Sequence, residues 1–254
     1  MKPLKLAFIL FLFIPKNVIW SQINQTDSKG RKQGPWQKTY PKSDVFQYKG
    51  QFRDDRPFGT FVYFYPGGEV KAEIEHQADG RRSRAFFYFE NKMLMTEGFY
   101  LDQKKDSTWV NYNQEGLVLG VETFKQDLLN GKKIIYYLEG QIETEKLNPL
   151  SVAFYKNDKL NGEYKEFFST GKLKIIGNYK EGKRIGEWKE YYPNGTIFTQ
   201  SKYKDDRLHG WLYSFNKDGE QIGKFMYQFG DKLSQEDLEE YLKMCEKKGL
   251  DPNQ

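Results

Sequence analysis

Cysteine and histidine are nearly absent from this sequence, and their absence excludes two classes of protein. The chain has 254 residues with one Cys and two His. A disulfide scaffold needs several cysteines, and a structural zinc site needs a set of Cys or His ligands. Alanine is scarce too, while Tyr, Phe and Gly number 18, 20 and 23. These three residue types suggest strands and turns rather than helices, so the composition favours a β protein.

The chain also lacks a strong excess of one charge. Lys plus Arg number 40 and Asp plus Glu number 35, which gives a formal net charge of +5. Both signs are mixed along the chain, whereas a nucleic-acid-binding protein concentrates Lys and Arg on one surface. We therefore expect no nucleic-acid partner. Aromatic residues make up 17% of the chain, which is too many for a disordered protein.

The N-terminal segment has the layout of an export signal. Two lysines precede nine consecutive apolar residues, 6–14, and a small Ser21 precedes Gln22. This order is typical of a secretory signal peptide, and the apolar run is too short to span a bilayer, which takes about 20 residues. We predict a signal peptide over 1–21, cleaved between Ser21 and Gln22, and a linker over 22–33. The expected location is the periplasm, the outer surface or the medium of a bacterium; an uncleaved N-terminal anchor is the alternative.

A segment of about 24 residues recurs through the rest of the chain, and such internal repeats are the mark of repeat architectures. Six copies open with Gly, and four of them carry an aromatic residue two positions later: Trp36, Phe61, Tyr164 and Trp188. Paired aromatics follow at positions five and six after the opening, and a second Gly follows at position nine. The clearest copies are 162–171 and 186–195. The opening glycines are Gly34, Gly59, Gly131, Gly162, Gly186 and Gly210. A later aromatic position is held by Tyr179, Tyr203 and Tyr227, with His76 in the same frame.

Two further copies fit this pattern with a substituted opening residue. One begins near Ala85 and the other near Ser107. The step from Gly131 to Gly162 is 31 residues long, which indicates a loop inserted in that copy. The pattern predicts about eight repeats over residues 34–232.

A single copy has the features of a β-hairpin. Residues 186–192 alternate, so Trp188 and Tyr191 would point to opposite faces of a strand. The turn signal at 193–195 contains Asn-Gly, and both residues tolerate positive φ. Residues 196–203 have the composition of the returning strand. We therefore predict an all-β fold, an extended single-layer antiparallel meander of repeated β-hairpins, in which stacked aromatic pairs each contribute about 0.2–1 kcal/mol.

The C-terminal segment breaks the repeat and has the features of a short helix. Ser234 is followed three residues later by Asp237, as in a capping box, and apolar residues recur at helical spacing up to Cys245. Gly249 ends the helix. We predict a capping helix and tail over 233–254 that cover the last hairpin, because an exposed sheet edge invites pairing with other chains. A partner-docking helix is the alternative.

The recurring Gly-x-Trp-x-x-Tyr-Tyr-x-x-Gly pattern resembles the bacterial variant of the MORN repeat (membrane occupation and recognition nexus). The resemblance covers about 34–230 and is strongest over 162–219, for example in Gly186-Glu-Trp-Lys-Glu-Tyr-Tyr-Pro-Asn-Gly195. It implies single-layered sheets of antiparallel hairpins with scaffolding or protein-binding roles, and lipid contact has been proposed for eukaryotic members. Some bacterial members are labelled antitoxins of toxin–antitoxin systems. That label fits poorly with an exported chain, because an antitoxin meets its toxin in the cytoplasm.

No catalytic constellation emerges from the sequence. His76 occupies an aromatic position of the repeat and His209 precedes Gly210, so both are interpreted as structural. Cys245 lies on an apolar helix face, whereas a nucleophilic cysteine needs an accessible, electropositive site. Asp and Glu lie in turns or alternate with Lys on strands. We predict a non-enzymatic protein with no catalytic residue, no metal site and no cofactor.

The leading hypothesis is an exported scaffold that binds a protein partner along an aromatic-rich sheet surface. The predicted partner-binding residues are aromatics expected to face away from the packing columns: Tyr65, Tyr137, Phe167 and Tyr191. Exposed aromatic strips rimmed by charge are typical recognition surfaces; the rings could equally shield the sheet by stacking and bind nothing. One alternative is an envelope carbohydrate- or lipid-binding module, because aromatic rings stack on sugars and Lys-rich strips attract anionic headgroups. An antitoxin-like inhibitor protein is the other. The sequence leaves the oligomeric state open.

Overall fold

A computed structural model describes residues 22–141 and 146–252, so the predicted signal segment 1–21, with Ser21, lies outside the described residues. The described chain forms a sheet of nineteen strands and one helix, α2 (Gln235–Lys248). The strands are β1 (Gln25–Thr26), β2 (Lys32–Thr39), β3 (Phe46–Arg53), β4 (Arg56–Phe64), β5 (Val70–His76), β6 (Arg82–Tyr88), β7 (Leu94–Leu101), β8 (Lys104–Tyr112), β9 (Val118–Lys125), β10 (Leu128–Tyr136), β11 (Pro149–Lys156), β12 (Lys159–Phe167), β13 (Leu173–Lys180), β14 (Lys183–Tyr191), β15 (Ile197–Lys204), β16 (Arg207–Leu208), β17 (Gly210–Phe215), β18 (Gln221–Gln228) and β19 (Asp231–Lys232).

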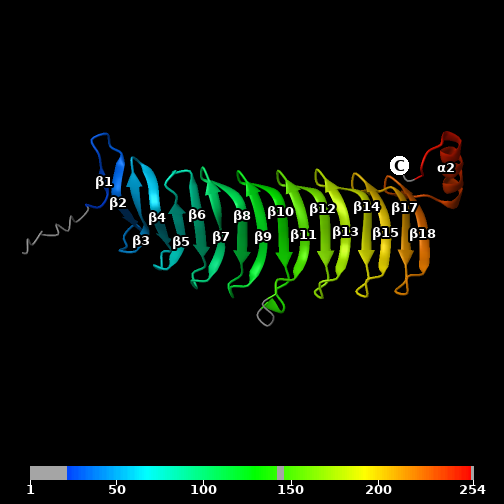
Figure 1. The fold of residues 1–254 in the computed structure, drawn as a ribbon, viewed down its shortest axis with the longest axis horizontal. Helices are drawn as coiled ribbons and strands as arrows, with labels where there is room; N and C mark the ends of the chain where they lie inside the picture. The colour runs from blue at the N-terminus through cyan, green and yellow to red at the C-terminus, as the bar shows by residue number, and fades with distance from the viewer. Residues whose placement is uncertain (1–21, 142–145, 253–254) are drawn as a thin grey trace, which may run out of the picture.

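Strands that follow one another in the chain pair antiparallel, from β1–β2 at one end to β18–β19 at the other. β16 and β17 are two parts of one strand position, since both pair with β15 and His209 lies between them. Figure 1 shows the strands side by side along the long axis of the molecule, with α2 next to β18 at one end. The predicted single-layer meander of hairpins with a C-terminal helix is confirmed.

Most turns along one long edge of the sheet have two central residues, both at positive φ. At Asp205 and Asp206 the φ angles are 50° and 69°. This geometry defines a type I′ turn, whose twist matches that of the flanking strands, and Asp and Asn tolerate it better than most residues. The last such turn, between β18 and β19, has Phe229 and Gly230 as its central residues. Their φ angles are 50° and 105°.

Turns along the opposite edge use the second glycine of the repeat. Gly195 has a φ of 97°, and its N–H donates to the carbonyl of Tyr192 at 2.8 Å, so the turn predicted at 193–195 is confirmed. In the third unit Lys92 holds the same position with a φ of 70°, a conformation that favours glycine. The extra residues of the long fifth unit lie in the chain between β10 and β11.

The opening glycine of a unit marks a β-bulge rather than a turn. In β4, Gly59 has a φ of 65°. The register passes from Gln51↔Phe58 to Lys49↔Val62, so three residues that begin with Gly59 stand opposite one residue of β3. Such an insertion bends the strand and increases its twist.

The strand register corrects one prediction about the repeat. An opening residue pairs with the late aromatic of its own unit, as in Gly186↔Tyr203. In the third unit this pair is Ser83↔Tyr100, so the copy begins at Ser83 and not near Ala85. The frame was hidden because Ala85 replaces the usual ring, and because β5 and β6 pair without a bulge and so need no glycine.

One face of the sheet, here called the aromatic face, holds most of the buried side chains. Phe61, Trp109 and Trp188 are 2%, 1% and 7% exposed. Each of these rings lies against a glycine of the preceding strand; a Cβ at Gly177 would overlap the indole of Trp188. The rings also meet those of neighbouring strands, and the centroids of Trp188 and Tyr179 are 5.1 Å apart. The predicted aromatic columns therefore form the core.

Residues at these two positions, eleven apart in sequence, compensate each other along the sheet. The pairs are Gly50 with Phe61, Ile74 with Ala85, Gly98 with Trp109, Glu122 with Lys133, Ala153 with Tyr164, Gly177 with Trp188, and Ser201 with Leu212. A large ring has a small partner, and Ala85 has a large partner, Ile74, directly opposite. The one charged pair forms an ion pair, with Lys133 Nζ 2.8 Å from Glu122 Oε1.

The helix α2 has the predicted caps. Ser234 Oγ accepts a hydrogen bond from the N–H of Asp237 at 3.1 Å, and Gly249 is left-handed with a φ of 62°. Cys245 of the helix and Met226 of β18 are both 2% exposed, so the helix stabilises the end of the sheet by covering apolar side chains. Within the part of the chain that the structure describes, no helix has the length and apolar content needed to cross a membrane.

Candidate protein-docking surface

The aromatic face is largely covered by its own side chains. The ammonium group of Lys105 lies 4.3 Å from the ring centroid of Trp109, and the guanidinium of Arg184 lies 4.1 Å from that of Tyr203. Long cationic side chains of this kind pack their stems on apolar rings while the charged end meets water. Most of this face is therefore committed to packing within the sheet.

The opposite face, here called the row face, carries an unbroken row of directly paired residues. Each member is the Cα partner of the next member on the neighbouring strand, and the row crosses the sheet from β2 to β18. We call this set the central row: Gln37, Lys49, Val62, Glu73, Phe86, Glu97, Val110, Val121, Ile134, Val152, Lys165, Ile176, Lys189, Gln200, Tyr213 and Lys224. All of them are half-buried except the two lysines nearest its ends, which are exposed.

The chemistry of the central row changes from one side of the sheet to the other. Glu73 and Glu97 form an acidic arm on β5 and β7, and Lys165 and Lys189 form a basic arm on β12 and β14. Four consecutive aliphatic residues lie between the two arms: Val110, Val121, Ile134 and Val152. Neighbouring strands lie about 4.8 Å apart, so these four side chains form one continuous apolar patch.

Tyrosine hydroxyls position the carboxylates of the acidic arm. Tyr88 donates to Glu73 Oε2 at 3.1 Å, and Tyr112 donates to Glu97 Oε1 at 2.9 Å. The other carboxylate oxygen of Glu97 lies 3.1 Å from a guanidinium nitrogen of Arg84. Burial, reinforced by the bond to Glu97, raises the pKa of Tyr112 to about 12. The hydroxyl therefore stays protonated and keeps its hydrogen bond at physiological pH.

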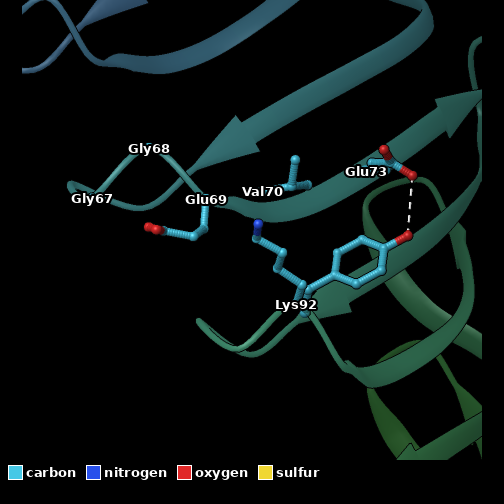
Figure 2. Close-up of a pocket in the computed structure, with 7 residues that line it drawn as sticks. Gly67, Gly68, Glu69, Val70, Glu73 and Lys92 are labelled. Carbon is cyan, nitrogen blue, oxygen red and sulfur yellow. Dashed lines mark hydrogen bonds between the residues drawn. The ribbon is translucent and has the colours of Figure 1, made fainter.

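A hollow of about 630 Å³ extends the acidic arm toward the nearer edge of the sheet. Figure 2 shows Lys92 reaching across this hollow toward β5, with Glu69 and Glu73 on its walls. Tyr88 also lines it. Two carboxylates against one ammonium group leave the hollow negative, so it suits a basic side chain.

Each lysine of the basic arm forms a partly exposed ion pair with the glutamate two residues before it on the same strand. Lys165 Nζ lies 2.7 Å from Glu163 Oε2, and Lys189 Nζ lies 3.2 Å from Glu187 Oε2. Exposed pairs of this kind contribute about 0–1 kcal/mol. Both ammonium groups can therefore turn to a carboxylate of a partner at little cost.

The four residues predicted to bind a partner fall at two positions of the repeat. Phe167 and Tyr191, at position five, are half-buried and lie on the row face two residues after the lysines of the basic arm. Tyr65 and Tyr137, at position six, donate their hydroxyls to the carbonyls of Tyr88 and Phe167 at 2.8 and 2.9 Å. These two tyrosines link one repeat unit to the next. Whether any of the four contacts a partner stays a prediction.

The central row itself was missed by the sequence analysis. Its members come from many strands, and their alignment depends on where each bulge inserts its extra residues. One signal could have found half of it, since position three of the repeat is always a row residue: Gln37, Val62, Phe86, Val110, Ile134, Lys165, Lys189 and Tyr213. The residue type at this position varies from copy to copy, whereas the glycines and aromatics that define the repeat recur.

The three side chains considered as candidate catalytic groups, His76, His209 and Cys245, lie in different parts of the fold. His76 Nδ1 is 3.0 Å from Ser83 Oγ, and burial lowers the pKa of His76. His209 is 6% exposed and packs against the ring of Phe229. Cys245 is buried on α2. Among the described residues, no group of three or more His, Cys, Asp or Glu side chains is placed to hold a metal ion.

Comparison with known proteins identifies a family for part of the chain. The family model described as MORN repeat variant matches residues 160–181 and 184–205, which correspond to the successive hairpins β12–β13 and β14–β15. No curated protein matches the sequence. A solved structure, the crystal structure of TarM, matches with 15% identity over 49% of this chain and 20% of TarM, at a TM-score of 0.21. The matched half of this chain thus spans about a fifth of the length of that protein.

Proposed function

We propose that this chain, two of whose repeats match the MORN repeat variant family model, is a non-enzymatic scaffold that binds a protein partner along its row face. The central row is the observation that carries the proposal. Its aliphatic centre is only half-buried in the free chain and lies between carboxylates on one side and ammonium groups on the other. Apolar patches rimmed by charge mark surfaces where proteins bind one another.

A protein partner fits this face better than a membrane surface does. Anionic headgroups attract a strip made of Lys and Arg alone. The acidic arm, Glu73 and Glu97, would repel such headgroups and attract the basic side chains of a protein. A surface with both signs and an apolar middle also specifies the orientation of its partner.

The test is affinity capture with a charge placed in the apolar centre. In Val121→Asp the carboxylate meets water in the free chain, but it must lose that water in a complex, and this costs several kcal/mol. The matched control is Leu128→Asp, because Leu128 is 41% exposed beside the β9–β10 turn and lies outside the central row. Wild type and Leu128→Asp should capture the same protein from an envelope extract, and Val121→Asp should not. Retained capture by a correctly folded Val121→Asp variant would remove the row face from consideration.

We also propose that the chain is exported. The proposal rests on the sequence of 1–21 alone, which lies outside the described residues. Cell fractionation with N-terminal sequencing tests it. Mature protein beginning at Gln22 in the envelope or the medium supports export, and full-length protein in the cytosol contradicts it.

One observation favours carbohydrate binding as a second candidate function. A hollow of about 850 Å³ on the aromatic face is lined by the rings of Tyr63 and Tyr100, by His76 and by Arg56 and Arg81. Aromatic walls with a few polar groups are the usual composition of a small-ligand site, and a sugar ring can stack on such walls. A glycan array probed with wild type and with His76→Ala tests this function, and the absence of signal for wild type would discard it.

A further inference from the structure

The central row is complementary to itself when its order is reversed. Take the line between β9 and β10 as the centre and count strands outward in both directions. Residues at equal distance from this line then form matched pairs: Val121 with Ile134, Val110 with Val152, Glu97 with Lys165, Phe86 with Ile176, and Glu73 with Lys189. Apolar residues meet apolar residues, and each glutamate meets a lysine.

We propose that the occupant of the row face is a second copy of this chain. The two copies dock face to face about a two-fold axis that runs parallel to the strands between β9 and β10. This inference rests on the proposed function, since it names the partner for the same surface. A two-fold axis makes the interface self-complementary, so each pair of the reversed row occurs twice.

Sheet geometry permits this arrangement. Two packed sheets lie about 10 Å apart, the thickness of two interdigitating layers of side chains. Their strand directions stay within about 30° of each other because each sheet is twisted. An axis parallel to the strands reverses the strand order of the second copy and leaves its side chains pointing at the first. Row then lies over row, in opposite order.

Charge selects the reversed order over the parallel one. In the reversed order Glu97 faces Lys165 of the second copy, and Glu73 faces Lys189. If the two rows instead ran in the same order, each glutamate would face the same glutamate of the second copy, and each lysine the same lysine. Such like-charge contacts disfavour that arrangement. The lysines are available, because their own pairs with Glu163 and Glu187 are partly exposed to water and therefore weak.

The surface has the size of a stable interface. The ten strands from β5 to β14, about 4.8 Å apart, span about 43 Å. With three rows of side chains about 7 Å apart, this gives about 800 Å² per copy, the share of one partner in a standard interface. Phe99 and Phe154, exposed 42% and 37%, widen the apolar centre on β7 and β11.

The two ends of the sheet remain outside this contact. Twist carries the outer strands of two packed sheets away from each other, so the close contact is confined to the ten strands from β5 to β14. The helix α2 lies beside β18 (Figure 1), beyond the ten strands, while the tail after it turns back, so that Asp251 lines a hollow with Glu187 of β14 and with Gln200 and Tyr213 of the central row. The tail therefore borders the tenth strand, and the strands from β5 to β13 are the ones clear of it.

On the outermost strands of the contact, β5 and β14, Glu75 and Glu187 of the neighbouring row would also face each other and offset part of the Glu73–Lys189 attraction. The choice of order therefore rests mainly on Glu97 and Lys165.

Charge reversal in solution tests the proposal. Sedimentation equilibrium of the wild-type chain should give the mass of a dimer. Glu97→Lys and Lys165→Glu should each weaken dimerisation at least tenfold, because each places like charges opposite one another twice. The double variant should recover wild-type affinity to within about threefold. The matched control, Lys183→Glu, reverses an exposed charge at the β13–β14 turn, outside the row, and should leave the dimer unchanged.

Mixing gives an independent measurement. Each single variant alone should dimerise at least tenfold more weakly than wild type, and the two should form a heterodimer when mixed, since the introduced lysine of one then faces the introduced glutamate of the other. Circular dichroism establishes that each variant is folded. A wild-type chain that stays monomeric, or single variants that dimerise like wild type, would overturn the proposal. A double variant that stays monomeric while folded would overturn the reversed order. If wild type is monomeric but Val121→Asp still abolishes capture of another protein, self-association fails while the proposed docking function stands.

Discussion

A size exchange within the aromatic face is the most direct test of what holds each hairpin together. In the seventh unit Trp188 lies against Gly177, and in the sixth unit Tyr164 lies against Ala153 at the equivalent positions. Gly177→Ala alone drives a methyl group into the indole. Trp188→Tyr alone removes ring atoms and leaves a gap. The double variant reproduces the Ala–Tyr pair that the chain already uses one unit earlier.

The expected free energies follow from the burial of Trp188, which is 7% exposed. Overpacking a core costs about 1–3 kcal/mol, so Gly177→Ala should lower the free energy of unfolding by that amount. Complete removal of a buried Trp costs about 3–5 kcal/mol; because tyrosine keeps one ring, Trp188→Tyr should cost about 1–2 kcal/mol. Independent effects would add to about 2–5 kcal/mol. We expect the double variant to cost about 1–2 kcal/mol, because the smaller ring accommodates the methyl group.

Urea unfolding, followed by far-ultraviolet circular dichroism, measures the free energy of unfolding of wild type, of the two single variants and of the double variant. Slopes should be compared as well as midpoints, since a long repeat array can unfold in parts. Asn178→Ala is the matched control, because Asn178 is exposed and points to the other face of the same strand; it should change stability by no more than about 0.5 kcal/mol. Strict additivity of the two changes would refute the idea that ring and glycine form one packing unit.

Three further predictions concern single positions. Tyr137→Phe removes the hydroxyl bond to the carbonyl of Phe167 and should cost about 1 kcal/mol in urea unfolding; no loss would show that the link between units is not stabilising. Lys92→Gly relieves a φ of 70° and should raise stability by about 0.5–1 kcal/mol; an unchanged thermal midpoint would argue against strain there. The pKa of Tyr112 is about 12 in the folded chain against 10.0 ordinarily, so its stabilising effect is complete below about pH 10 and is lost as the pH rises through about 12. Tyrosinate absorbance should lose a late-titrating group in Tyr112→Phe, and the pKa of Tyr112 should fall in Glu97→Gln; an unchanged absorbance curve in Tyr112→Phe would contradict the assignment.

Local features of the fold were predictable because each depends on a few neighbouring residues. Gly195 defines its turn through a backbone conformation that glycine tolerates, and Ser234 and Gly249 define the helix ends through their capping bonds. Alternation along 186–192 places Trp188 on one face of the strand and Tyr191 on the other. Repetition of these signals about every 24 residues makes the meander a necessary consequence.

Features that depend on register were not predictable in the same way. Ser83 opens the third unit without a glycine, because β5 and β6 pair without a bulge. Position six of the repeat looked like an exposed aromatic strip, yet the hydroxyls of Tyr65 and Tyr137 are bonded to carbonyls of the next unit. A hydrogen bond between residues 23 to 30 positions apart leaves no local trace in the sequence.

The sequence by itself determined the unit: a hairpin with a glycine turn, an aromatic core position and a helix at the end. Its alternation and turn residues act within one copy, so no long-range information is needed to specify them. Only the tertiary structure decided which residues of successive copies stand opposite one another. Each bulge shifts the pairing of one strand against the next, and the sum of these shifts aligns Glu73, Glu97, the aliphatic centre, Lys165 and Lys189 into a single row. The physical reason is that the row is made by backbone pairing between strands, which no single segment of the chain contains.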